Sequence, residues 1–254
     1  AVRCTVSMPT IALCVSSMNR LWQLKRALPL NLMRCWPHRA YVRVHVVVFT
    51  RDDGTDDDTL QFLLRCCGAA IEAGLLVVYR TNRMPTWHAS VAKNTVHMCA
   101  TEDILVNLDG DNLINPELPA VVAWHFRNGC SMLHWADGEG TCGRIACRRQ
   151  DFHMLRGYDE DCYPMGAQDV DLVLRLKALP GAKGCKVVGG AFSTAIPNTL
   201  QEKVKCCSPG YGKLRWGRMD TFNRCLFKLR RDAGQLVRNL EVKQIGVEVW
   251  RADG

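Results

Sequence analysis

The chain has 254 residues, and 48% of them are hydrophobic, which is enough for one large globular domain or two fused half-domains. Charged residues make up 23%, an ordinary share that excludes a wholly disordered chain. No apolar run reaches the roughly 20 residues of a membrane-spanning helix, so no transmembrane segment is expected.

The first residues are Ala1-Val2-Arg3-Cys4, which include neither an initiator Met nor the charged-then-apolar pattern of a signal peptide. This start is typical of an excised or processed domain. The sequence therefore leaves the compartment open.

Fourteen cysteines occur in the chain without any C-x-x-C spacing. The adjacent pairs Cys66-Cys67 and Cys206-Cys207 lack the spacing of a zinc site. We expect mostly free, buried thiols, with a few disulfides as the alternative.

The first half of the chain alternates short apolar runs with helical patterns. Strands are expected at four apolar runs, which are Thr10–Ser16, Val42–Phe49, Leu75–Tyr79 and Ile104–Leu108. Apolar residues spaced by three and four predict helices between them, from residue 21 to near Pro37, over Thr59–Ala73 and over His88–Cys99. This alternation predicts a mainly parallel, doubly wound α/β sheet flanked by helices.

The second half is less regular. Helices are expected at Leu118–Asn128, Gln150–Leu155 and Gly166–Leu179, and strands at Ser131–Trp135 and Gly143–Cys147. No internal repeat or low-complexity linker divides the chain. We therefore expect a single domain over residues 1–254.

Two acidic turns follow strands of the predicted sheet. Asp52 and Asp53 come after Val42–Phe49, and Asp109-Gly110-Asp111 follows Ile104–Leu108. Because the carboxyl ends of parallel strands share one edge, both turns are expected at one crevice. Two carboxylates separated by a glycine can hold a hard divalent cation that bridges a diphosphate. The alternative is an ordinary turn, in which Asp-Gly-Asp is also common.

A third acidic group begins the expected helix over Gly166–Leu179. Asp169 and Asp171 fall in its first turn, where the helix dipole stabilises a carboxylate. Spacing alone favours this capping role. In the alternative interpretation, Asp169 is a general base aimed at a hydroxyl group.

Taken together, these segments resemble known enzymes. Family 2 glycosyltransferases have an opening strand and turn that resemble Ile11–Arg20 (IALCVSSMNR), and an acidic uridine-contacting turn that resembles Val48–Leu60 (VFTRDDGTDDDTL). Their donor-binding helix, strand and D-x-D motif resemble Ala89–Glu117 (ASVAKNTVHMCATEDILVNLDGDNLINPE). The C-terminal catalytic segment of β-1,4-galactosyltransferase-like enzymes is similar to Gly143–Leu176 (GRIACRRQDFHMLRGYDEDCYPMGAQDVDLVLRL).

The resemblance implies a GT-A (Rossmann-like) fold. Its parts would be a nucleotide-sugar-binding half over 1–117, an acceptor and catalytic half over 118–200, and a basic C-terminal segment over 201–254. It implies an inverting hexosyltransferase that moves a sugar from a nucleotide-sugar donor, UDP-linked or similar, to a hydroxyl of a glycan, protein or lipid acceptor. Mn²⁺ or Mg²⁺ would be the cofactor. A cytoplasmic enzyme, or a Golgi luminal domain freed from a membrane anchor, would fit.

The family's functional positions match residues of this chain one by one. Asp109 and Asp111 match the metal-binding pair, and Asp169 matches the catalytic base. Donor and nucleotide contacts are implied for Ser16, Asn19, Asp52, Asp53, Lys93, Asn94 and Asp109. Sugar or acceptor contacts are implied for Gln168, Asp171 and Tyr163.

The chain departs from the family pattern at three places. Gln168 stands where the galactosyltransferase-like pattern usually has Glu. All seven His lie at or before His153, so the downstream His that often completes the metal site is absent. Ser16-Ser17 replaces the usual Pro-Thr or a close variant.

The net charge of +8 is concentrated in residues 201–231, which contain nine Lys or Arg and two acids. This segment either meets a diphosphate, an acidic acceptor, a membrane surface or nucleic acid, or forms a solvated basic helix. We expect no nucleic acid partner. Most tryptophans, including Trp22 and Trp36, are expected to be packing residues.

Two other functions compete with sugar transfer. A nucleotidyltransferase can share a nucleotide-binding α/β sheet and paired aspartates, but it usually has a Gly-rich loop after the first strand, and Ser16–Arg20 contains no Gly. A degenerate, non-catalytic carbohydrate- or nucleic-acid-binding module is the other alternative. Gln168 and the absent His keep that interpretation open.

Overall fold

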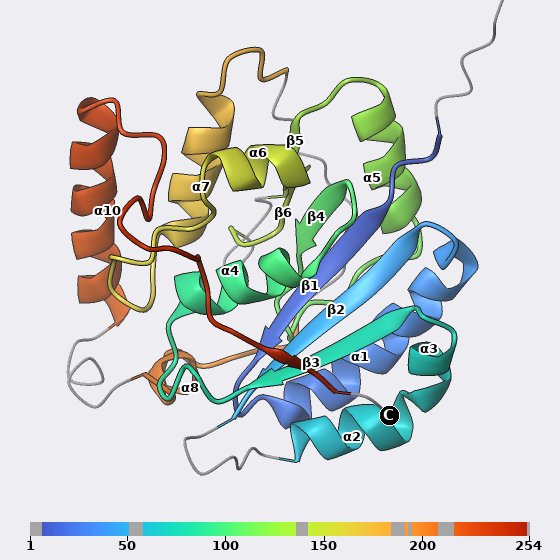
Figure 1. Ribbon diagram of the computed structural model, residues 1–254. Coiled ribbons are helices and arrows are strands. Elements are labelled where there is room, and N and C mark those ends of the chain that lie inside the picture. The colour runs from blue at the N-terminus through green and yellow to red at the C-terminus, as the bar shows by residue number, and fades with distance from the viewer. Residues whose placement is uncertain are drawn as a thin grey trace, which may run out of the picture.

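The computed structural model describes residues 7–50, 58–135, 142–183, 191–192, 195–207 and 216–252. Within these ranges seven strands form one sheet, in the spatial order β5 (Met132–His134), β6 (Ile145–Arg148), β4 (Ile104–Asn107), β1 (Ile11–Ser17), β2 (Val42–Phe49), β3 (Leu76–Thr81) and β7 (Trp250–Arg251) (Figure 1). The central strands β4, β1, β2 and β3 pair in parallel, while β5, β6 and β7 add antiparallel pairs at the two sides. The predicted α/β fold with a mainly parallel sheet is confirmed.

Helices connect the strands and cover the sheet. They are α1 (Leu21–Cys35) with the short 3-10 helix η1 (Trp36–His38), α2 (Thr59–Cys66), α3 (Gly68–Glu72), α4 (Ala89–Cys99), α5 (Leu118–Arg127), α6 (Arg149–Met154), α7 (Gln168–Lys177), α8 (Leu200–Val204) and α10 (Trp216–Asp232). None of these described helices is long and apolar enough to cross a membrane.

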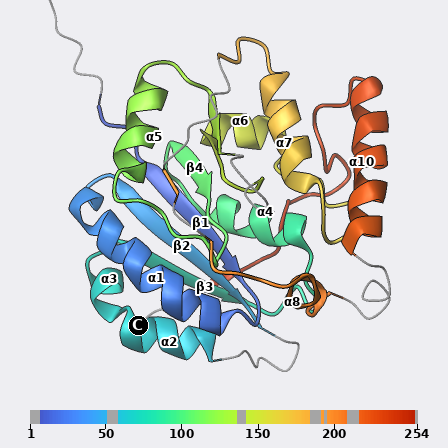
Figure 2. The ribbon, with the colours of Figure 1, turned by 180° about the vertical axis from the view of Figure 1, so that it is seen from behind.

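Each face of the sheet buries its own core. On the face seen in Figure 2, α1, α2 and α5 pack against alternate strand residues, with Leu24, Leu63, Val122, Leu13 and Val44 among the buried side chains. On the face seen in Figure 1, α4, α6 and α7 do the same with Val96, Phe152, Leu172, Cys14 and Val47. The strands are therefore covered on both sides, as their β-branched composition predicts.

One expected helix is broken in the structure, and one short strand was not expected. The single helix expected over Thr59–Ala73 is broken at Cys67, whose backbone angles (φ −113°, ψ 14°) are not helical, and a separate short helix begins at Gly68. A glycine stabilises a helix less than most residues. The short strand β7 was not expected, because two residues carry no periodic pattern.

The loop that leads into α7 is held by α10. The Asn223 side chain accepts a hydrogen bond from the Tyr163 backbone N–H (2.8 Å), and its amide donates to the Gly166 carbonyl (2.8 Å). Gly166 has φ +101°, and a Cβ there would lie 2.6 Å from Asp220 Cα. Only glycine fits this close approach. The residue before α7 is Ala167, also at positive φ (62°) and without a side-chain capping bond.

A buried ion network attaches the C-terminal segment to the second half of the sheet. Asp171 is fully buried, and its carboxylate meets Arg175 Nε at 2.7 Å and Arg238 Nη2 at 3.1 Å. Arg238 Nε also lies 3.0 Å from Asp159, which pairs with Arg230 of α10 as well. Arg230 of the basic segment and Arg238, which follows that segment in the chain, thus form ion pairs with the buried Asp159.

The cysteines that lie in the described ranges are all free thiols. Most are buried or partly buried, while Cys66, Cys142 and Cys225 are exposed. Burial raises the pKa of Cys35 and of Cys162 to about 12. These findings agree with the expected buried thiols.

We predict that Asp171→Ala strongly destabilises the protein. Removing the carboxylate leaves the buried Arg175 without its paired carboxylate and leaves Arg238 with Asp159 alone. Breaking a buried pair in this way typically costs about 3 to 5 kcal/mol. Asp232→Ala is the matched control, because Asp232 forms the same i,i+4 pair with Lys228 at 2.7 Å but both side chains are exposed. Such a pair contributes at most about 1 kcal/mol. Urea unfolding of both variants checks the difference, and equal losses would contradict the assignment.

Candidate functional site

The Asp109-Gly110-Asp111 turn begins where β4 ends. Asn107, the last residue of β4, donates from Nδ2 to Asp109 Oδ1 (3.2 Å) and to the Gly143 carbonyl (2.8 Å). The Asp109 side chain is 36% exposed, so the turn fixes this carboxylate without burying it. Asn112 closes the turn by donating its backbone N–H to the Asp109 carbonyl (2.9 Å).

Lys93 of α4 connects Asp109 to Asp169. Its Nζ atom lies 2.6 Å from Asp169 Oδ1 and 3.6 Å from Asp109 Oδ1, and the lysine side chain is only 6% exposed. The ammonium also lies 5.5 Å from the centre of the buried Tyr158 ring. We call Lys93, Asp109 and Asp169 the Lys93 cluster.

Opposing effects set the charges of this cluster. Burial raises the pKa of Asp169, the Lys93 ammonium opposes that rise, and the neighbouring Asp109 adds to it. Burial alone would lower the pKa of Lys93, but Asp109 and Asp169 outweigh burial and the pKa is raised. Lys93 therefore stays protonated. One ammonium lies beside two carboxyl groups, so acidic groups outnumber basic groups in the cluster.

Gly143 allows the strand β6 to approach this cluster. A Cβ at position 143 would lie 2.8 Å from Asp109 Oδ2 and 3.2 Å from Lys93 Nζ. Any larger residue would push against the carboxylate. Gly143 therefore keeps open the space beside the second oxygen of Asp109.

Asn94, expected as a donor contact, has another set of partners. It is fully buried, and its amide donates to the Tyr158 carbonyl (2.8 Å) and to Glu160 Oε1 (2.7 Å). Its oxygen accepts from the Tyr158 backbone N–H (2.8 Å). Asn94 thus holds the loop at residues 157–160 against α4 instead of joining the Lys93 cluster.

Asp171, expected as a sugar or acceptor contact, likewise lies elsewhere. Its carboxylate is engaged by Arg175 and Arg238 in the ion network described above. Asp169, two residues earlier, is the acid of α7 that reaches the cluster.

The remaining expected residues lie near the same edge of the sheet or outside the described ranges. Gln168 begins α7 and is buried, and its Oε1 has no hydrogen-bond partner within the ranges that the structure describes. Asp111 lies beside Asp109, and its backbone carbonyl accepts from Ile196 (2.8 Å). Asp52 and Asp53 lie outside the described residues.

Three further expected residues have local contacts. Ser16 is half-buried near the end of β1. Asn19 has a positive φ of 53°. Its Nδ2 atom lies 3.5 Å from Cys206 Sγ. The Tyr163 ring packs edge-on against Phe222 of α10, with 4.6 Å between ring centres.

The sequence interpretation missed three residues beside the cluster. Asn107 and Gly143 are described above. His134, at the end of β5, interacts electrostatically with Asp169. Burial lowers the pKa of His134. A hydrogen bond with the Cys142 carbonyl (3.1 Å) and the charge of Asp169 both oppose this lowering. The only available signal was position, since each lies at or near an end of a predicted strand, namely Ile104–Leu108, Gly143–Cys147 and Ser131–Trp135.

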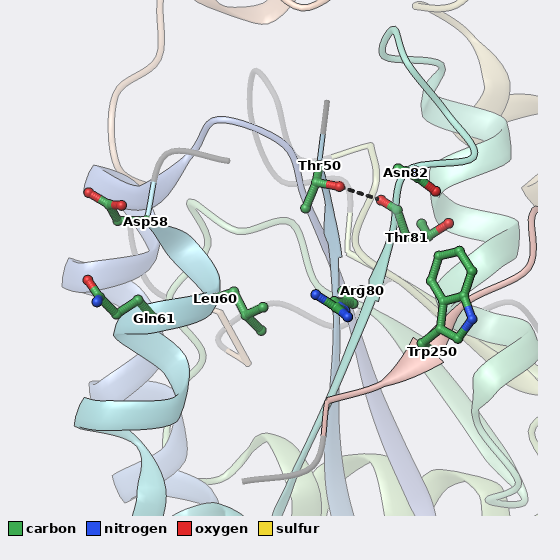
Figure 3. A pocket seen from close by; sticks show the side chains of 8 residues that line it. All are labelled: Thr50, Asp58, Leu60, Gln61, Arg80, Thr81, Asn82 and Trp250. Carbon is green, nitrogen blue, oxygen red and sulfur yellow. Dashed lines mark hydrogen bonds between the residues drawn. The ribbon is translucent and has the colours of Figure 1, made fainter. Parts of the chain in front are cut away.

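A cavity of about 470 Å³ opens further along the same edge, at the carboxyl ends of β2 and β3 (Figure 3). Arg80 of β3 and Trp250 of β7 are direct partners across the antiparallel pair. The cavity is lined by Thr50, Asp58, Leu60, Gln61, Arg80, Thr81, Asn82 and Trp250. An aromatic ring, a guanidinium and two amides therefore surround a space large enough for a small organic group.

No protein-family model matches the chain, and no curated protein matches it in sequence. Solved structures do match. The mannosyltransferase PcManGT from Pyrobaculum calidifontis, in complex with GDP-Man and Mn²⁺, aligns with a TM-score of 0.60 and 17% identity over 90% of this chain and 77% of that one. TarS 1-349 from S. aureus, in complex with UDP-GlcNAc, aligns with a TM-score of 0.57 and 17% identity over 75% of this chain and 60% of that one.

The strand order, the helices on both faces and these alignments agree with one another. At such identities the likeness establishes the architecture. The chain therefore has the GT-A fold of nucleotide-sugar glycosyltransferases.

Proposed function

We propose that this chain is an inverting, metal-dependent glycosyltransferase that moves a sugar from a nucleotide-sugar donor, UDP-linked or similar, to an acceptor hydroxyl. The observation that carries the proposal is the Lys93 cluster. A carboxylate after the fourth strand of a GT-A sheet and a carboxylate in the first turn of α7 are brought to one buried ammonium. Asp109, proposed to bind the metal and the donor, would then lie close to Asp169, proposed to activate the acceptor.

The residues at the turn fit a divalent cation. Within the described ranges there is no cluster of three or more His, Cys, Asp or Glu side chains. Mg²⁺ and similar ions do not require one, because they are often held by one or two carboxylates together with waters and substrate phosphates. Asp109 and Asp111 would supply those carboxylates, and the absence of a side chain at Gly143 leaves room beside Asp109 Oδ2. When bound, the ion would offset the charge that develops on the departing diphosphate.

Asp169 would act as the general base. One of its oxygens is used by Lys93, and the side chain remains 16% exposed, so the acceptor hydroxyl can approach. As the acceptor oxygen bonds to the anomeric carbon, the bond from that carbon to the diphosphate oxygen breaks, and the hydroxyl proton passes to Asp169. This single displacement inverts the anomeric centre. Lys93 would oppose the rise in the pKa of Asp169 that burial causes, and so would favour the ionised base.

Two further features support binding of the donor and the acceptor. The cavity at Arg80, Asn82 and Trp250 lies on the same edge of the sheet as Asp109 and fits the nucleoside end of a donor. The unpartnered Gln168 Oε1, next to Asp169, would accept a hydrogen bond from a sugar hydroxyl. A buried acceptor left unpaired is costly, so a ligand that pairs with it gains affinity.

We predict that a nucleoside diphosphate raises the melting temperature only when Mn²⁺ or Mg²⁺ is present. A ligand at a hundredfold excess over its dissociation constant stabilises the native state by about 2.7 kcal/mol. Asp111→Asn should remove the metal-dependent part of the shift, whereas Asp232→Asn, an exposed aspartate on α10, should keep it. A thermal-shift series with UDP and GDP measures this. If neither nucleotide shifts the wild type with metal, the donor assignment is wrong.

We predict that Asp169→Asn lowers turnover by at least about a hundredfold, because general-base catalysis contributes roughly that much or more. Donor binding should persist, since it is proposed to rest on the Asp109 turn and the cavity. Asp161→Asn is the control, because Asp161 is an exposed carboxylate in the neighbouring loop. Release of nucleoside diphosphate from a donor panel is the measurement. A near wild-type rate in Asp169→Asn would exclude the assigned role.

A further inference from the structure

The outer side of α1 carries an exposed stripe of large apolar side chains. Trp22, Leu30, Met33 and Trp36 are between 40% and 63% exposed. Their spacing places them along one side of the helix and its continuation in η1, opposite the buried Leu24 and Leu28. Trp22 and Trp36 were expected to be packing residues, but each is about two-fifths exposed, Trp22 on α1 and Trp36 on η1. We call this side of α1 and η1 the tryptophan face.

The tryptophan face is also cationic. Arg26 stacks over Trp22 and Arg39 over Trp36, each with 5.1 Å between the guanidinium carbon and the ring centre. Lys25 is exposed on the same helix. The sequence has no Asp or Glu from residue 1 to residue 51, so no acid within α1 or η1 balances these charges.

From this combination we propose that the tryptophan face binds the surface of an anionic lipid bilayer. A helix lying flat on a membrane presents Trp and aliphatic side chains to the acyl boundary and Lys or Arg to the headgroups. Trp ring edges favour the headgroup level, and Arg side chains extend past them toward phosphates. Attraction to anionic lipid supplies the charge complementarity.

The position of α1 in the fold suits this role. The helix lies on the outside of the layer seen in Figure 2, away from the helices α4 and α7 that carry Lys93 and Asp169. Within the part of the chain that the structure describes, acids such as Asp58, Glu72 and Glu117 belong to or border other helices of this layer. Membrane contact would therefore leave the Lys93 cluster free, and the inference does not depend on the proposed function.

The experiment is co-sedimentation of the full chain with vesicles of phosphatidylcholine, with or without phosphatidylserine. Wild-type protein should bind the phosphatidylserine vesicles, and binding should fall as salt rises. Lys25→Glu should weaken binding at least about fivefold, because each cation near the surface contributes about that factor. Met33→Glu should weaken it at least about tenfold, since it removes apolar contact and adds repulsion.

Leu229→Glu is the matched control. Leu229 is as exposed as Met33 and lies on α10, which is also basic. It should bind like the wild type. Loss of binding in this variant but not in Met33→Glu would overturn the assignment to α1. Wild-type protein that binds neither vesicle, or both equally, would overturn the proposal. A dimer that Met33→Glu converts to a non-binding monomer would show that a second copy covers the face instead.

Discussion

The buried ammonium of Lys93 is the constraint around which the candidate site is built. Two carboxylates from distant parts of the chain, Asp109 and Asp169, would repel each other at this edge of the sheet if no cation stood between them. The same helix places Asn94 one residue later, where it fixes the loop at residues 157–160. Two consecutive residues of α4 therefore hold the first half of the sheet and the second half together.

The second half of the chain is held by ion pairs between arginines and buried aspartates. The sequence concentrates cations in residues 201–231, a pattern that suggests a solvated helix or a binding surface. In the structure, Arg230 turns inward to Asp159, and Arg238 joins Asp159 to Asp171. Arg224 and Lys228 do remain in exposed pairs. Some cations of residues 201–231 therefore stabilise the fold through ion pairs, while others remain on the surface.

Much of the fold could be predicted from local patterns. Runs such as Val42–Phe49 are long, β-branched and bounded by turns, and the strands β1 to β6 lie within a few residues of where they were expected. The parallel order followed from the alternation of strands and helices. The position of Asp109 at the end of a strand could be predicted as well, because it depends only on where the strand ends.

The rest depends on contacts between residues far apart in the sequence. Lys93 and Asp169 are separated by 76 positions, and no local pattern states that they touch. Asn94 was assigned to a donor contact because the pair Lys93-Asn94 matches a pair in the family, but its partners in the structure are the Tyr158 backbone and the Glu160 carboxylate. Asp171 lies on the same helix as Asp169, but two positions along a helix point to roughly opposite sides, and Asp171 therefore meets Arg175 and Arg238. The sequence pattern places both acids in the first turn of the helix but does not tell which of them is enclosed by arginines.

Some cysteines of the chain are buried and others are exposed, so spectroscopic probes can be attached to the exposed ones. A thiol must ionise to react with maleimides or similar reagents, so the buried Cys35 and Cys162 are protected by their raised pKa. Cys142 is exposed and directly precedes Gly143, so a fluorophore placed there would report on events beside Asp109. Cys225 is exposed on α10. Cys66 on α2 is exposed as well, so labelling of the described cysteines would place probes beside the site, on α2 and on α10.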